Sequence, residues 1–158
     1  VRQATFGMYC FWSGEACLGQ IPGLLGSRVG FLDGHEVVEI EYDPNELSYA
    51  TLLQEAHTRG CADSVFVQDT KEERIAQSVF GNRVQHSQAA FRLAPKTDQK
   101  HALQYTDLKS VELTPRQALQ SNAIVATGAS PQALLSPRQQ AQAGLTINSA
   151  QNAALGWE

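Results

Sequence analysis

The chain has 158 residues, a formal net charge of −4 and a hydrophobic fraction of 42%. That length is enough for one domain that buries most of its apolar surface. The acidic balance, with no basic stripe, argues against a nucleic-acid partner, and no apolar run approaches the roughly 18 residues that cross a membrane. We therefore expect a soluble protein that binds neither nucleic acid nor membrane.

The start of the chain and its cysteines set two further expectations. The chain begins with Val1 and enters a strand almost at once, without a visible signal peptide, so we expect a trimmed N-terminus. The compartment, cytoplasmic or exported, then stays open. Three cysteines, an odd number with no C-x-x-C spacing, do not indicate a disulfide scaffold and fit a thiol enzyme or buried structural thiols better.

The first third of the chain alternates strand and helix signals. Asp33-Gly34 is a signal for a tight hairpin, and Ser48 is a suitable cap for a following helix. The expected elements are strands at 3–8, 24–31 and 36–42 and helices at 10–20 and 49–60.

The third expected strand carries an acid on its apolar side. Glu36, Val38, Ile40 and Tyr42 share one face of the strand, and all but the first are apolar. Glu36 is therefore expected to face the core at the start of the strand, where an acid needs a specific reason.

The middle of the chain completes an α+β pattern. We expect a strand at 64–67 ("SVFV"), a charged turn or helix at 69–76, and a strand-like segment at 77–80 ("QSVF") before the turn at Gly81-Asn82. The order β-α-β-β-α-β is that of a ferredoxin-like split β-α-β plait.

The last third has a different composition, rich in Ala and Gln. Residues 96–108 are polar and predict an irregular strand or loop. Helices are expected near 115–125, 131–135 and 137–143, where Ser or Thr followed by Pro marks helix starts. We therefore predict a catalytic α/β plait over 1–95 and, over 96–158, a C-terminal helical extension packed on the same domain.

Cys10 is the strongest chemical signal. A thiol at a helix N-terminus is stabilised as the thiolate by the helix dipole, and the neighbouring Phe11 and Trp12 could wall a pocket for a methyl or thioether group. Glu36 in the same apolar pocket would stay protonated and act as a general acid. Such a pair suits the reduction of an oxidised sulfur, which leaves a sulfenic acid on the cysteine. The alternative is that Cys10 is a small core residue, the more common role of cysteine in an apolar stretch.

Several separated motifs resemble the methionine-S-sulfoxide reductase (MsrA) family. They are "ATFGMYCFWSGE", "IPGLLGSRVGF", "DGHEVVEIEYDP" and "LSYATLLQEAH", which follow the family's order at close to its spacing over residues 3 to 57. The resemblance implies that Cys10 is the nucleophile, Glu36 the catalytic acid, and Phe11 and Trp12 the aromatics that hold the substrate methyl. It implies structural roles for the matched positions Glu15 and His35.

The chain also departs from the family pattern. Tyr9 replaces the glycine before the cysteine and adds bulk at the rim of the pocket, where it would contact substrate. The loop between the second and third strands is cut to "FLDGH", and "TKEERIAQSVF" replaces a later segment, so two tyrosines that bind the substrate oxygen in the family are missing. The family's C-terminal tail with resolving cysteines has no counterpart. Tyr9, Tyr105 and His57 are candidates to compensate for the missing tyrosines.

Two other cysteines remain. Cys61 follows the second helix and is either a buried small residue or a resolving thiol that attacks the Cys10 sulfenic acid. Cys17 lies two helical turns from Cys10, about 10.5 Å away, beyond the roughly 7 Å that a disulfide spans, so we expect it in the core.

The remaining polar candidates carry less chemistry. The histidines at 86 and 101 lie in polar stretches and are expected to be solvated, and the acids at 63 and 69 are expected to cap turns. No ligand spacing among the His and Cys residues supports a metal site.

Two functions follow from these observations. The first is a reductase of methionine-S-sulfoxide, free or in protein, with no bound cofactor and with electrons from thioredoxin, glutaredoxin or glutathione. The second is a binding or regulatory module that has lost turnover and binds oxidised methionine, a partner redox domain, or a soft metal through Cys10 and Cys61.

Overall fold

The structure is a computed structural model that describes residues 1–144; the rest of the expected extension lies outside the described residues. The strands are β1 (Arg2–Gly7), β2 (Leu24–Leu32), β3 (His35–Tyr42), β4 (Ser64–Val67), β5 (Val84–His86) and β6 (Arg92–Leu93). The α-helices are α1 (Phe11–Leu18), α2 (Tyr49–Thr58), α3 (Thr70–Phe80), α4 (Pro115–Ala126) and α5 (Pro137–Gln142). Short 3₁₀ turns are η1 (Gly81–Arg83), η2 (Lys96–Asp98), η3 (His101–Tyr105), η4 (Asp107–Ser110) and η5 (Gln132–Leu134).

The strands form one mixed sheet in the order β5-β4-β1-β3-β2-β6. All neighbouring pairs are antiparallel except β4 and β5, which run parallel. Helices and sheet share one fold, so the expected α+β class is confirmed. The ferredoxin-like plait is a finer assignment and stays a prediction here.

The hairpin between β2 and β3 follows the sequence signal closely. Asp33 and Gly34 both have positive φ, 53° and 77°, which is the backbone of a two-residue turn that suits the twist of the two strands. The turn fixes the register that pairs Phe31 with Glu36 and Val29 with Val38. This register sets where Glu36 lies in the sheet.

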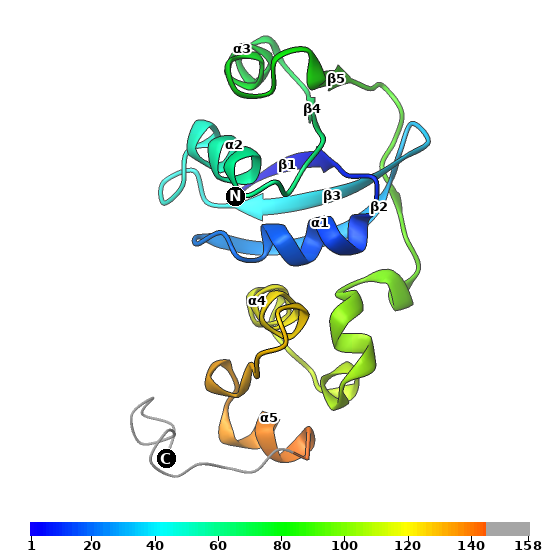
Figure 1. The fold of residues 1–158 in the computed structure, drawn as a ribbon, viewed down its shortest axis with the longest axis vertical. Helices are drawn as coiled ribbons and strands as arrows, with labels where there is room; N and C mark the ends of the chain where they lie inside the picture. The colour runs from blue at the N-terminus through cyan, green and yellow to red at the C-terminus, as the bar shows by residue number, and fades with distance from the viewer. Residues whose placement is uncertain (145–158) are drawn as a thin grey trace.

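Helix α1 covers the face of the sheet that carries Val38. A Cβ on Gly14 would lie 3.1 Å from Val38 Cγ2, so glycine lets the helix approach the strand closely. Leu18 and Phe6 are fully buried in the same apolar core. Figure 1 shows α1 lying along β2 and β3, with α4 next to it.

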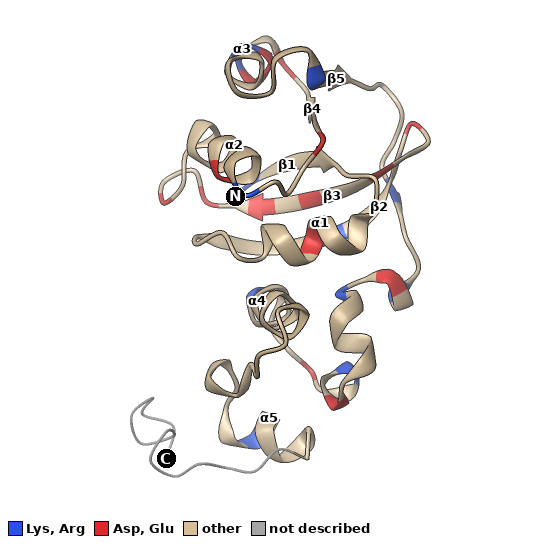
Figure 2. Ribbon diagram, viewed as in Figure 1, with Lys and Arg blue, Asp and Glu red and all other residues tan. Residues whose placement is uncertain are grey.

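Where α1 packs on β2 and β3, acidic residues lie on α1 and on β3 (Figure 2). On β3, Glu39 is 7% exposed and accepts a hydrogen bond from Arg28 at 2.6 Å. This bond raises the pKa of Arg28 above its ordinary value. The buried acid is therefore paired, as a buried charge must be.

One predicted strand is wrong. Residues 77–80, expected to be strand-like, form the last turn of α3, which begins at the Asp69 cap. Ala76 and Phe80, four residues apart, are both buried, so these apolar side chains lie on one face of a helix. The edge strand β5 begins only after the turn η1.

The helix starts of the last third match their sequence signals. Thr114 and Ser136 each cap a helix, and Gln117 and Gln139 complete a capping box at the respective helix. The expected helix at 131–135 is only the 3₁₀ turn η5. Leu103, Leu108, Val111, Leu135 and Ala143 form a second small core beneath this segment.

Helix α4 joins this segment to α1 and β2. A Cβ on Gly19, at the end of α1, would lie 2.8 Å from the carbonyl oxygen of Leu119, so the two helices approach closely. Leu119 belongs to the main core. Among the helices of residues 1–144, none is both long and apolar enough to serve as a membrane span.

Candidate active site

The segment between β1 and α1 is tied to two neighbouring strands. The Met8 amide donates to the carbonyl oxygen of Glu36 at 3.2 Å, and the Asp63 amide donates to the carbonyl oxygen of Gly7 at 2.8 Å. The Tyr9 amide donates to Asp63 Oδ2 at 3.0 Å. These bonds fix the backbone just before Cys10, the N-cap residue of α1.

The structure brings Glu36 to the helix end that Cys10 begins. Glu36 Oε1 accepts a hydrogen bond of 3.1 Å from the backbone amide of Phe11, the residue after Cys10. The half-buried Cys10 is the free cysteine of the chain. The sequence places Cys10 and Glu36 26 positions apart, and the β2–β3 hairpin brings Glu36 to the residue that follows Cys10.

A pocket of about 340 Å³ opens beside this contact. It is lined by Gly7, Met8, Tyr9, Gly34, His35, Glu36, Asp63 and Ser64. The lining includes two acids, Glu36 and Asp63, and none of the predicted Cys10, Phe11 and Trp12. The pocket is large enough for a small polar group such as a sulfoxide and its neighbouring carbons.

The two aromatics after Cys10 have different surroundings. Phe11 is only 5% exposed, belongs to the main core and lies 5.5 Å from the ring of Phe31. Trp12 is 40% exposed. Trp12 is therefore the accessible ring next to the thiol, while Phe11 supports it from the core side at 6.5 Å.

The exposed Trp12 is held by residues far along the chain. Its indole Nε1 donates to Asp98 Oδ1 at 3.0 Å, and its ring stacks on His101 at a centroid distance of 3.6 Å. Tyr105 lies edge-on to His101, with the ring centroids 5.1 Å apart. The expectation that His101 is solvated is wrong, because its ring lies against Trp12 and its Nδ1 is buried.

Of the two roles left open for Cys61, a buried small residue and a resolving thiol, the structure supports the buried one. Cys61 is fully buried and forms a disulfide with Cys17, with the two Cα atoms 5.3 Å apart. The expectation that the cysteines form no disulfide framework is corrected by the same bond. Cys61 is then neither a thiol for Cys10 nor a metal ligand with it in this state.

Asp63 is a pocket residue that the sequence reasoning missed. It was expected to cap a turn, but its carboxylate binds the Tyr9 amide and lines the same cavity as Glu36. By contrast, Asp69 does cap α3, accepting from the Glu72 amide at 2.7 Å. No local signal separates these two acids, since only the pairing of β1 with β4 brings Asp63 next to Tyr9.

The three residues named as compensating donors are dispersed. Tyr9, 77% exposed, lines the pocket. His57 lies edge-on to Phe80 at 5.4 Å, and Tyr105 belongs to the Trp12 stack. Tyr9 is therefore the one of the three that lines the cavity of Glu36.

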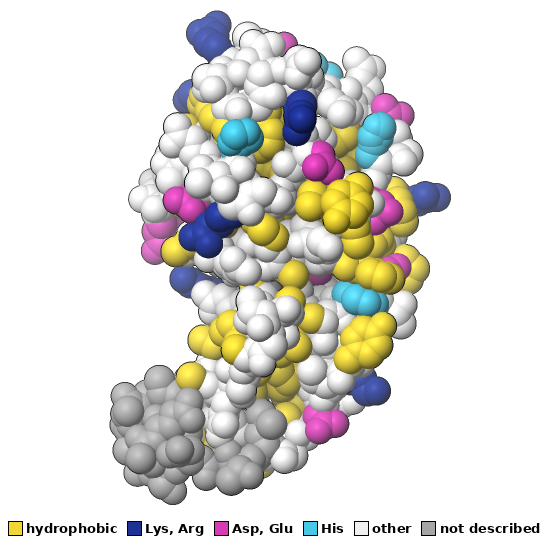
Figure 3. Space-filling model, viewed as in Figure 1, with side chains coloured by type: hydrophobic (Ala, Val, Ile, Leu, Met, Phe, Trp, Pro, Cys, Tyr) yellow, Lys and Arg dark blue, Asp and Glu magenta, His cyan; other side chains and the backbone are white. Residues whose placement is uncertain are grey.

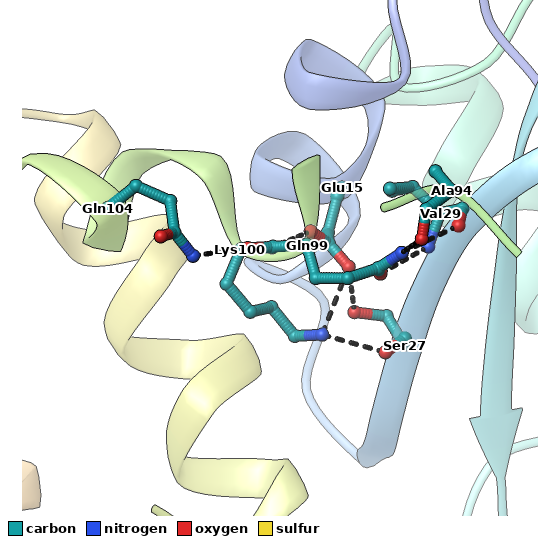
Figure 4. Close-up of polar contacts among 7 residues, drawn as sticks. All are labelled: Glu15, Ser27, Val29, Ala94, Gln99, Lys100 and Gln104. Carbon is teal, nitrogen blue, oxygen red and sulfur yellow. Dashed lines mark hydrogen bonds and ion pairs between the residues drawn. The ribbon is translucent and has the colours of Figure 1, made fainter. Parts of the chain in front are cut away.

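Glu15 anchors α1 from the opposite side. Fully buried, it accepts from Ser27 Oγ at 2.7 Å and from the Lys100 amide at 2.7 Å, and the Lys100 ammonium lies 3.2 Å away (Figure 4). Its structural role is thus that of an ion pair between α1 and η3. Within residues 1–144, no cluster of three or more His, Cys, Asp or Glu side chains is arranged to hold a metal ion.

Comparison with known proteins decides the relationship. The chain is 37% identical to peptide methionine sulfoxide reductase MsrA 1 of Nostoc over 70 residues, which cover 34% of this chain and 43% of the relative. It is 37% identical over 67 residues to the MsrA of Thermoactinomyces vulgaris, covering 32% of this chain and 54% of the relative. Over about a third of its length, this chain is related to the MsrA family.

The relationship is partial. A peptide methionine sulfoxide reductase of Drosophila melanogaster is 40% identical over 63 residues, 32% of this chain but 26% of the relative. The chain thus spans about half or less of the length of the curated relatives it matches. No protein-family model matches the chain.

The coverage also shows a difference in length between the aligned regions. Since 34% of 158 residues is about 54, fewer than the 70 aligned positions, the aligned region is shorter in this chain than in the Nostoc protein.

Proposed function

We propose that this protein reduces methionine-S-sulfoxide to methionine, with Cys10 as nucleophile and Glu36 as general acid. The observation that carries the proposal is the hydrogen bond from the Phe11 amide to Glu36 Oε1, which sets the acid at the helix end that begins with the free thiol. The MsrA relationship and the inner strand order β4-β1-β3-β2, which fits a ferredoxin-like plait, support it.

The chemical step balances with these two groups alone. The Cys10 thiolate attacks the sulfoxide sulfur, the S–O bond breaks, and the oxygen passes to Cys10 as a sulfenic acid with the proton that Glu36 donates. The sulfoxide sulfur gains two electrons and the Cys10 sulfur loses two. Glu36 Oε1 is bound to the Phe11 amide, which leaves Oε2 to hold the proton.

The helix end favours this step electrostatically. The N-terminus of α1 carries the positive end of the helix dipole, which stabilises a thiolate at the cap position. Tyr9, His35 and Ser64 line the cavity and are the donors that we assign to the sulfoxide oxygen. Trp12 is the ring that we assign to the substrate methyl, with Phe11 behind it.

An external thiol reductant completes the cycle. Cys61 is bonded to Cys17, so we propose that two thiols of thioredoxin, glutaredoxin or glutathione reduce the Cys10 sulfenic acid. That step forms a disulfide in the reductant, restores the Cys10 thiol and releases water. No bound cofactor enters either step.

The proposal is tested by turnover of dabsyl-methionine S-sulfoxide with dithiothreitol. Turnover should vanish in Cys10→Ser and fall by about 10²-fold or more in Glu36→Gln, the range that general acid catalysis contributes. The R-sulfoxide should not be consumed. Glu41→Gln removes an exposed acid of the same strand and should leave the rate unchanged.

Two results would overturn the proposal. One is turnover that persists in Cys10→Ser. The other is the absence of turnover in the wild type while iodoacetamide still alkylates Cys10, which would indicate a binding module instead. The Cys17→Ser, Cys61→Ser double variant should keep turnover, because its thiols take no part in the step.

A further inference from the structure

We propose that Asp98 and His101 are positioning residues that hold the Trp12 indole in the orientation that receives the substrate methyl. This inference rests on the proposed function, since it assigns a role to residues outside the matched motifs. Asp98 and His101 belong to the C-terminal segment, 86 or more positions from Trp12 in sequence.

The two contacts restrict different motions of the ring. The bond from Nε1 to Asp98 Oδ1 at 3.0 Å sets the direction of the indole N–H. The His101 ring, only 2° from parallel and 3.6 Å away, covers one face of the indole. A substrate methyl can therefore contact only the other face or the edge of the Trp12 ring.

The residues that hold Trp12 are themselves anchored. The Gln99 side chain donates to the Val29 carbonyl oxygen and accepts from the Val29 amide, each at 2.8 Å. The Lys100 amide binds Glu15, which lies on α1 one turn after Trp12 (Figure 4). Asp98 and His101 flank these two residues and are thus fixed to the helix that carries Trp12.

An exposed ring needs such support. Trp12 is 40% exposed. Figure 3 shows exposed hydrophobic side chains and a histidine close together on one face of the molecule. Without fixed neighbours a half-exposed side chain populates several rotamers, and the apparent affinity falls with the share of the competent one. We call Asp98 and His101 the Trp12 clamp. Their loss should therefore raise KM and leave kcat nearly unchanged.

Steady-state kinetics with dabsyl-methionine S-sulfoxide test this. Asp98→Ala and His101→Ala should each raise KM by about 2- to 10-fold, the range that one aromatic stack or hydrogen bond is worth, with kcat within about twofold. Asp98→Asn keeps an oxygen acceptor and His101→Phe keeps a stacked ring, so both should restore KM. Asp107→Ala, an exposed acid of the same segment, is the matched control.

Tryptophan fluorescence measures the clamp without turnover. In a Trp157→Phe background Trp12 is the remaining tryptophan, and acrylamide should quench it more strongly in Asp98→Ala and His101→Ala than in Asp107→Ala. Unchanged quenching, or an unchanged KM in an active enzyme, would overturn the inference. A wild type without turnover would refute the proposed function, and quenching would still decide whether the clamp exists.

Discussion

At the scale of single residues, buried ionisable groups have the largest expected effects on stability. Glu15 is fully buried and its charge is balanced by Lys100, whose side chain is 16% exposed. Removing one partner of a buried pair leaves an uncompensated charge, which costs more than the pair itself contributes.

We expect Lys100→Met to lower the free energy of unfolding by about 3–5 kcal/mol, because the Glu15 carboxylate then loses its countercharge. Urea denaturation measures this. Lys109→Met, on an exposed lysine of η4, is the control and should change little. Equal urea midpoints for the two variants would show that the Lys100 ammonium does not stabilise the buried Glu15 carboxylate.

A second residue prediction concerns alkaline pH. Burial, followed by the charge of Glu72, raises the pKa of Tyr49 above its usual 10.0. The unfolded chain then releases this proton first, so stability should fall as pH rises above about 10. Tyr49→Phe should flatten that fall in thermal melts, whereas Tyr105→Phe, on a tyrosine that is 80% exposed, should not. In Tyr49→Phe a smaller fall of stability with pH should remain, because burial also raises the pKa of Tyr42.

At the scale of elements, the Cys17–Cys61 disulfide ties the C-terminal end of α1 to the chain just after α2. The two cysteines are 44 residues apart in sequence, so the bond closes a long loop in the unfolded chain.

Cys17→Ser with Cys61→Ser should lower the free energy of unfolding by up to about 4 kcal/mol, from the loop entropy of a closure of this length. Denaturation in the absence of reductant measures the loss, and dithiothreitol should produce a similar loss in the wild type. Cys10→Ser should leave stability nearly unchanged, since Cys10 is free. A thiol titration that finds three free cysteines without reductant would contradict the prediction.

At the scale of the whole molecule, the C-terminal segment supplies partners to the sheet and to α1. Gln99 occupies the Val29 backbone groups, Lys100 balances Glu15, and Leu119 of α4 enters the main core. The expected boundary after residue 95 therefore lies between residues that are hydrogen-bonded or ion-paired to each other.

A chain that ends after residue 95 should not unfold cooperatively, because Glu15 and the Val29 groups would lose their partners. Circular dichroism during thermal melting checks this against the full chain. A cooperative transition of the shortened chain at the wild-type temperature would show that residues 1–95 fold independently.

The sequence by itself determined the features that depend on neighbours along the chain. Asp33-Gly34 specified its turn, Ser48 its helix cap, and the alternation of β3 placed Glu36 on the side of Val38. The motifs around Cys10 were sufficient to indicate the MsrA relationship. Residues 77–80 misled because a short apolar run fits a strand or a helix end equally well.

Only the tertiary structure decided which distant residues meet. Asp63 at Tyr9, Asp98 and His101 at Trp12, and Cys61 at Cys17 are contacts between segments with no shared periodicity. Such contacts depend on strand pairing and on where the C-terminal segment packs, and local propensity carries no information on either. The strand face of Glu36 and the helix start at Cys10 were therefore predictable, whereas these long-range contacts were not.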